Sequence, residues 1–249
     1  MEHLSYSRLN CYLNCPLQFE YRYVDKVPEP ISDALVLGSA VHDAIAWFFR
    51  TWLEKKNRPT AEQTTAFFIS RWSSKEYLSS DNWNGEIVWA RPDDEIFDLG
   101  LELVTLFVCR TTLRPILVEQ EFKRELNGVP FVGRLDLIDT RGRIIDFKTK
   151  SSAWASAEYR QKALSHDLQP IAYAALLGGP AICEWHFLLK SKVPKYLVSR
   201  FEVTEAQLSW FCDVLVPSVW QAIQAGAFPP RPSKLCQYCN FREECKLPL

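Results

Sequence analysis

Hydrophobic positions follow a helical period in the first half of the chain. Ser5 and Ser7 are candidate caps of a first short helix, and Pro16 suits the first turn of a second. Across residues 36–56, apolar side chains recur at spacings of three and four, which predicts a long helix. Residues 60–110 continue in the same way. We expect a break at Arg91-Pro92, because proline cannot continue a helix from the preceding residue.

The period then becomes that of strands. Strands are predicted over 116–123, 129–139 and 143–149, and Asn127-Gly128 is typical of a hairpin turn. A helix follows over 168–177, with Asp167 as its N-cap and Gly178-Gly179 as its stop. Two more strands, over 182–189 and 197–203, precede a helix over 205–225. This order predicts one mixed α/β domain over residues 1–249.

Composition and charge exclude several classes of protein. The 249 residues are 47% hydrophobic and 24% charged, as in globular proteins. No apolar run approaches a membrane span, and the first residues lack a signal peptide's pattern, so we expect a cytoplasmic protein without a membrane partner. The net charge of −1 gives no overall basic field. However, residues 185–201 carry four cations and no acid, which indicates either a polyanion-binding face or an ordinary solvated one.

Eight cysteines in a chain expected inside the cell favour metal binding over disulfides. Cys236, Cys239 and Cys245 are close in sequence, but zinc and iron–sulfur sites normally take four ligands. Cys15 is the best candidate for the fourth, and Cys11 is the alternative. Such a centre would join segments 1–30 and 227–249 as a structural clasp, and the spacing alone does not separate zinc from iron–sulfur. The other three cysteines have apolar neighbours and are predicted core residues: Cys109, Cys183 and Cys212.

The stretch from Gly133 to Thr149 carries the candidate chemistry. Asp146 and Lys148 are two apart in a predicted strand and therefore share a face. If residues 140–142 form a three-residue loop with Gly142 left-handed, Asp136 lies directly opposite Asp146, whereas a two-residue loop separates the carboxylates. Two adjacent carboxylates suit Mg²⁺ or Mn²⁺, beside which Lys148 could orient or deprotonate a water or offset developing charge. The alternative is an exposed face with ordinary Asp–Lys pairs.

Four short motifs together resemble the RecB-like branch of the PD-(D/E)xK nucleases: Gly38-Ser-Ala-Val-His42, Gly133-Arg-Leu-Asp136, Asp146-Phe-Lys148-Thr149 and Gln169-Pro-Ile-Ala-Tyr173. The N-terminal and C-terminal segments resemble the iron–sulfur clasp of AddB-type nucleases and CRISPR-associated exonucleases, through Ser5-Tyr-Ser-Arg-Leu, Cys15-Pro16 and the three terminal cysteines. The resemblance extends from Ser5 to Cys245.

This resemblance implies a restriction-endonuclease-like core, a mixed sheet flanked by helices. It implies that His42, Asp136 and Asp146 ligate the metal together with the Phe147 carbonyl. Lys148 would be the catalytic lysine, and Gln169 and Tyr173 would line the site and contact DNA. It further implies that a [4Fe–4S] cluster, favoured over zinc, is held by four cysteines: Cys15, Cys236, Cys239 and Cys245.

The expected function is therefore a Mg²⁺- or Mn²⁺-dependent exonuclease on single-stranded or end-exposed DNA, in repair or recombination. A CRISPR spacer-processing nuclease and a non-catalytic DNA-binding or assembly subunit are the alternatives. No G-x-x-x-x-G-K-[ST] loop is present, so a helicase would have to act in trans. Residues 57–115 carry no recognised motif and could shape a DNA channel or fill the core. Within them, Trp72, Trp83 and Trp89 could stack on bases or pack inside.

Overall fold

The computed structural model describes residues 1–74, 86–245 and 247 of the chain. Its main sheet has five strands in the order of the sequence. Within this sheet β5 and β6 are the parallel neighbours, and their crossover contains a 3₁₀ turn (Ser152–Ala155) and the helices α6 (Ala157–Leu164) and α7 (Gln169–Leu177). The strands are β3 (Pro115–Leu126), β4 (Val129–Asp139), β5 (Ile144–Ser151), β6 (Ala181–Lys190) and β7 (Lys195–Val203). This arrangement confirms the predicted mixed α/β class.

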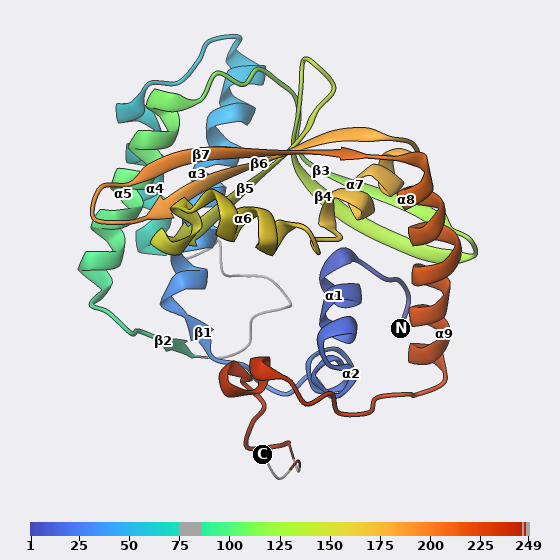
Figure 1. Ribbon diagram of the computed structural model, residues 1–249. Helices are drawn as coiled ribbons and strands as arrows, with labels where there is room; N and C mark the ends of the chain where they lie inside the picture. The colour runs from blue at the N-terminus through green and yellow to red at the C-terminus, as the bar shows by residue number, and fades with distance from the viewer. Residues whose placement is uncertain (75–85, 246, 248–249) are drawn as a thin grey trace.

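Helices cover both faces of the sheet (Figure 1). One layer holds α3 (Asp33–Lys55), α4 (Ala61–Ser74) and α5 (Asp93–Arg110), next to a small parallel pair, β1 (Ile31–Ser32) and β2 (Ile87–Val88). The other layer holds α1 (Tyr6–Asn14), α6 (Ala157–Leu164), α7 (Gln169–Leu177), α8 (Glu205–Trp210) and α9 (Val216–Gln224). Each layer has its own hydrophobic core against the sheet, so β5 is buried from both sides.

The two ends of the described chain meet on one side of the molecule. Helix α1 continues into α2 (Pro16–Phe19) and a π-helical turn (Glu20–Val24), beside a C-terminal 3₁₀ turn (Lys234–Tyr238) (Figure 1). The Tyr12 hydroxyl donates to the Ala227 carbonyl at 2.6 Å, and the Tyr21 hydroxyl donates to the Glu244 carbonyl at 3.0 Å. Leu4 also bridges to Phe131 in β4.

Local signals explain most helix ends. The Ser5 side chain accepts the Arg8 N–H, so Ser5 rather than Ser7 caps α1. Gly178, at φ +88°, ends α7 in the left-handed conformation as predicted. The start of α7 differs from the prediction by one residue: Leu168 is the backbone N-cap, while the Asp167 carboxylate accepts the Gln169 N–H at 2.9 Å, as expected of a capping side chain.

Two further expectations change in detail. The helix expected over 205–225 contains a π-helical turn, Phe211–Leu215, between α8 and α9. Cys183 is buried as predicted and Cys212 is partly buried, but Cys109 is exposed. It lies near the end of α5, where its neighbours Phe107 and Val108 take the inward positions.

The helical region before the sheet is mainly core. Trp72 is buried on α4, and its ring lies 6.3 Å from that of Trp89 and 5.8 Å from that of Phe97. These contacts favour packing over base stacking for Trp72 and Trp89, while Trp83 lies outside the described residues. Among the helices that the structure describes, none has the length and apolar character needed to cross a membrane.

Candidate active site

The turn between β4 and β5 sets the geometry of the site. Leu137 pairs with Ile145 and Ile138 pairs with Ile144, which is the register of the predicted three-residue loop. Gly142 has φ +73°, the left-handed value that this loop requires. The ladder ends one step before Asp136, whose Oδ2 instead accepts the backbone N–H of Phe147 at 2.9 Å. Asp136 therefore lies across from the start of the Asp146-Phe147-Lys148 segment.

Asp146 is the most enclosed polar group of the site, with 2% of its surface exposed. Its Oδ1 accepts hydrogen bonds from Gln169 Nε2 at 3.0 Å and from the Tyr173 hydroxyl at 3.2 Å. Gln169 and Tyr173 lie one turn apart on α7 and therefore reach the same carboxylate. The predicted convergence of these three side chains is present.

Lys148 lies between Asp146 and α7. Its Nζ donates to Gln169 Oε1 at 2.9 Å and lies 2.7 Å from Asp146 Oδ2. The contact with Oδ2 is an ion pair without hydrogen-bond geometry, so this buried oxygen has no hydrogen-bond partner. Buried carboxylate oxygens rarely lack a hydrogen bond, and a role in binding a cation is one of the usual reasons.

Burial and charge move the pKa values of these groups in a consistent way. Burial raises the pKa of Asp146 to about 6, against the lowering effect of Lys148. Burial lowers the pKa of Lys148, but the carboxylates of Asp146 and Asp136 outweigh it, so the net pKa lies above its ordinary value. Burial, then Asp146, raises the pKa of Tyr173 well above its ordinary value. At neutral pH Lys148 is therefore an ammonium and Tyr173 a neutral hydrogen-bond donor.

Helix α3 brings His42 to the same place. His42 Nδ1 lies 3.6 Å from Asp136 Oδ2. The close approach of α3 to β5 depends on Gly38, because a Cβ at that position would lie 3.2 Å from Thr149 Oγ1. His42, Asp136, Lys148 and the backbone of Phe147 line one open cavity of about 510 Å³. Three of the four sequence motifs thus contribute residues to one cavity, and the fourth reaches it through the hydrogen bond of Gln169 to Lys148.

Comparison with known proteins agrees with this arrangement. Residues 3–246 match the PD-(D/E)XK nuclease superfamily. The chain belongs to this superfamily. Among solved structures, this nuclease-superfamily chain is similar to a protein of Eubacterium rectale described as a putative exonuclease, with a TM-score of 0.61 and 15% identity over 100% of this chain and 91% of that chain. At that identity the likeness shows the fold alone. The structure of SSO0001 aligns with a TM-score of 0.38 and 17% identity over 98% and 96% of the two chains, and no curated protein matches.

One acidic residue of this nuclease-superfamily site was missed from the sequence. Glu119 on β3 lines the same cavity, at the position across from Asp136. Its φ is +49°, an unusual value for a residue other than glycine, and Arg134 lies 3.8 Å away. Burial, followed by the charge of Asp136, raises the pKa of Glu119 to about 7. Alternation along a strand does not reveal a residue whose backbone leaves the strand conformation.

The predicted cluster cysteines surround a second cavity, of about 1150 Å³, between α1, α2 and the C-terminal segment. The Arg231 N–H donates to Cys15 Sγ, and the Ser233 N–H donates to Cys236 Sγ, both at 3.4 Å. Cys11, the alternative ligand, is buried beside Arg22. Within residues 1–74, 86–245 and 247, no three His, Cys, Asp or Glu side chains are arranged to hold a metal ion. Both predicted metal sites therefore stay predictions.

Proposed function

We propose that this member of the superfamily is a divalent-metal-dependent deoxyribonuclease, an exonuclease on single-stranded or end-exposed DNA that serves repair or recombination. The observation that carries the proposal is the buried Oδ2 of Asp146, which accepts no hydrogen bond and is paired by charge with the Lys148 ammonium 2.7 Å away. A satisfied structural network has no reason to retain such an atom.

The donor set fits a hard cation. Asp136 and Asp146 offer carboxylate oxygens, His42 offers an imidazole nitrogen, and the Phe147 carbonyl is the fourth candidate ligand. Bound Mg²⁺ or Mn²⁺ would lower the pKa of a water and polarise a phosphoryl oxygen. Gln169 and Tyr173 hold Asp146 Oδ1 by hydrogen bonds, so Oδ2, beside the Lys148 ammonium, would be the oxygen offered to the cation.

Lys148 acts as a fixed positive charge in this scheme. Its pKa lies above the ordinary value, so it does not remove a proton from water at neutral pH. Gln169 Oε1 fixes the direction of the ammonium, so its charge is in place before the phosphate develops negative charge. Among the roles open to this lysine, the proposal therefore favours offsetting charge on the reacting phosphate.

The test uses 5′- and 3′-labelled oligonucleotides, single- and double-stranded, with Mn²⁺, Mg²⁺ or EDTA. We expect metal-dependent shortening from an end in the wild type, and a loss of about 100-fold or more in Lys148→Ala. Lys55→Ala, an exposed lysine at the end of α3, is the charge-matched control and should cleave like wild type. Equal cleavage by Lys148→Ala would overturn the proposal. Binding without cleavage would indicate an assembly subunit instead.

We also propose that Cys15, Cys236, Cys239 and Cys245 bind a [4Fe–4S] cluster. Support comes from their thiols, which line one cavity, and from two backbone N–H groups that already donate to sulfur, as at sites that tune such clusters. Anaerobically purified protein should contain about four irons with labile sulfide, and Cys239→Ser should lose both and melt at a lower temperature. Zinc without sulfide would favour the zinc alternative, and no metal would refute both.

A further inference from the structure

Two aromatic rings lie just after β5, the strand that carries Asp146 and Lys148. Trp154, in the 3₁₀ turn after β5, packs on Phe187 with ring centroids 5.2 Å apart. Tyr159, on α6, meets Trp154 edge-on at 5.7 Å and has 48% of its surface exposed. An aromatic ring this exposed, supported from below by two others, is a surface on which a flat ligand can stack.

The platform, Trp154 with Tyr159, adjoins the catalytic lysine. Phe187, which supports Trp154, is the register partner of Lys148 on the neighbouring strand, and such strands lie about 4.8 Å apart. Lys150 points its Nζ over the Trp154 ring, 4.9 Å from the centroid, and also lines the catalytic cavity. The platform and the cavity therefore share a cation.

The platform is held in place without a ligand. One guanidinium nitrogen of Arg160 donates to the carbonyls of Trp154 and Ala155, at 2.7 and 3.0 Å. Ser156 caps α6 by accepting the Tyr159 N–H. Because these contacts fix the backbone beneath both rings, little ordering is required when a ligand binds.

We infer that the exposed ring of Tyr159, supported by Trp154, stacks an unpaired base of the substrate strand while Lys150 binds its phosphate. The inference rests on the proposed nuclease function and specifies its substrate. Stacked aromatics beside cations are the way in which proteins hold single strands without reading sequence. Within a duplex, both faces of every internal base are covered by its neighbours, so the platform selects single strands or frayed ends.

The test measures binding rather than cleavage. Fluorescence anisotropy of a labelled single strand, in EDTA and in the Lys148→Ala background, should show an affinity about tenfold weaker for Tyr159→Ala and near wild type for Tyr159→Phe. A 2-aminopurine placed near the end should lose its quenching in Tyr159→Ala alone. Binding of a blunt duplex should be the same in all variants.

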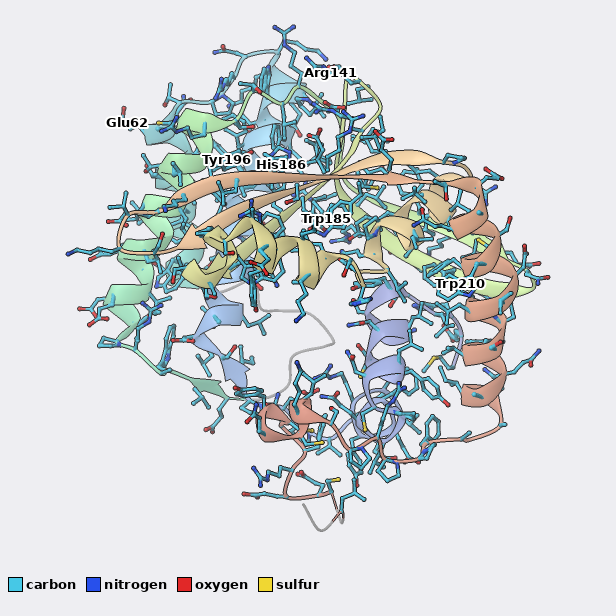
Figure 2. All side chains as sticks on the ribbon, viewed as in Figure 1. Glu62, Arg141, Trp185, His186, Tyr196 and Trp210 are labelled. Carbon is cyan, nitrogen blue, oxygen red and sulfur yellow. The ribbon has the colours of Figure 1, made fainter. Side chains whose placement is uncertain are left out.

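Trp210→Ala is the matched control, since Trp210 is equally exposed on α8, apart from α6 in Figure 2. Unchanged single-strand affinity in Tyr159→Ala would overturn the platform while leaving Lys148-dependent cleavage intact. An equal loss for the duplex would reduce the platform to a general binding surface and would also overturn it. No binding of any DNA by the wild type would refute the proposed function together with the platform.

A separate observation concerns Asp167, which the sequence suggested only as a cap. Its Oδ1 accepts hydrogen bonds from the Tyr6 hydroxyl and the Gln169 N–H, both at 2.9 Å, and its Oδ2 accepts the Trp185 Nε1–H at 3.0 Å. Gln169 in turn contacts both Lys148 and Asp146. Asp167 thus connects α1, which lies beside the cysteine cavity, to the start of α7, which carries Gln169.

The geometry points to Tyr6 and Asp167 as positioning residues that fix Gln169 and, through it, the Lys148 ammonium. This second inference also rests on the proposed nuclease function. Removing the Tyr6 hydroxyl takes away one of the three hydrogen bonds that hold Asp167, so its carboxylate positions Gln169 less firmly, but no substrate contact changes. The expected signature is a lower kcat at an unchanged KM.

Tyr6→Phe should lower kcat several-fold, whereas Tyr12→Phe, which removes a comparable α1 hydroxyl bonded to Ala227, should not. Asp167→Asn retains a side-chain oxygen acceptor and should keep more activity than Asp167→Ala. If Tyr6→Phe and Tyr12→Phe had equal kcat values, and melting curves showed both variants to be folded, the positioning role of Tyr6 and Asp167 would be overturned. If the wild type does not cleave, single-strand binding still tests the platform. The positioning role of Tyr6 and Asp167 is then refuted together with the proposed function.

Discussion

Two buried polar networks lie on opposite faces of β5 and β6, and they are built in opposite ways. Asp146 faces the α7 layer, and its Oδ2 has no hydrogen-bond partner. Glu184, one strand away, pairs in register with Ile145 and faces the α5 layer. Its Oε1 accepts from Arg143 Nη1 at 2.6 Å, and its Oε2 lies 3.4 Å from His186 Nε2.

The second network is satisfied throughout. Arg143 also holds Asp139, which accepts further backbone N–H groups from the turn, and His186 Nδ1 is 2.5 Å from the Tyr196 hydroxyl. Figure 2 shows His186 and Tyr196 on one face of the sheet and Trp185 on the other. The pKa values separate the networks: His186 and Arg143 lower that of Glu184 to about 2, whereas burial raises that of Asp146 to about 6.

The difference teaches that burial of charge does not by itself mark a functional site. Glu184 ionises easily because every oxygen has a donor, so its network holds the β4–β5 turn to β6. Asp146 ionises against a cost, which a bound cation would offset. The incomplete network is therefore the one to test for chemistry, and the complete one for stability.

The largest expected effect is on the activity of Asp146→Asn. Loss of this ligand should reduce metal-dependent cleavage by about 100-fold or more. In EDTA above pH 6, the same variant removes the cost of a buried carboxylate but also the partner of the Lys148 ammonium, so its melting temperature should fall less than that of Arg143→Ala. Strong destabilisation would mean that Asp146 is structural, in the manner of Glu184.

Arg143→Ala should have the largest effect on stability. It leaves Asp139 and Glu184 buried without their cation, which costs about 3–5 kcal/mol. Arg141→Ala, on the exposed side of the same turn (Figure 2), keeps its backbone bond to Asp139 and should cost about 0.5 kcal/mol or less. Urea unfolding of both variants measures the difference. Similar values would show that the satisfied network contributes no more than surface charge.

The sequence predicts one of these networks much better than the other. The loop that places Asp136 across from Asp146 is local, because Gly142 allows only certain turns, and α7 brings Gln169 and Tyr173 to one face by its period alone. Glu184 and His186 share β6, but their partners Arg143 and Tyr196 come from other segments and reach them only through the pairing of β6 with β5 and β7. No pattern within any one strand indicates these contacts.

The same distinction explains the other misses. Asp167 has the residue type and place of an N-cap, but Tyr6 and Trp185 occupy its carboxylate, and both come from distant parts of the chain. Glu119 adopts a positive φ where the strand pattern predicts extended backbone. The 3₁₀ turn and α6 carry no clear apolar stripe, since they expose most of their surface. Long-range contacts decide each of these cases, and a single sequence does not contain them.

The pH dependence of stability should separate the two carboxylates. The folded-state pKa of Glu184 is lowered from 4.5 to about 2, so its contribution is present above pH 4.5 and is lost as the pH falls toward 2. That of Asp146 is raised from 3.8 to about 6, so stability is lost as the pH rises through this interval. In EDTA, Glu184→Gln should weaken the pH dependence of the melting temperature at acid pH. Asp146→Asn should weaken it between pH 4 and 6. If Glu184→Gln instead acted between pH 4 and 6, and Asp146→Asn at acid pH, the comparison of the two networks would be contradicted.

Two phenols, of which Tyr173 is buried and Tyr196 partly buried, give the smallest and most selective test. The Tyr173 hydroxyl is 2.6 Å from Gln169 Nε2 and 3.2 Å from Asp146, while the Tyr196 hydroxyl contacts His186. Tyr173→Phe should reduce cleavage about tenfold with little change in stability, because it removes one of the two hydrogen bonds that hold Asp146 Oδ1 and leaves that of Gln169 in place. Tyr196→Phe should cost about 1 kcal/mol and leave cleavage unchanged, because it removes one bond from a complete network. Cleavage rates and unfolding free energies of both variants test this prediction. Each variant removes a single oxygen atom, and the two differ only in the network that loses it.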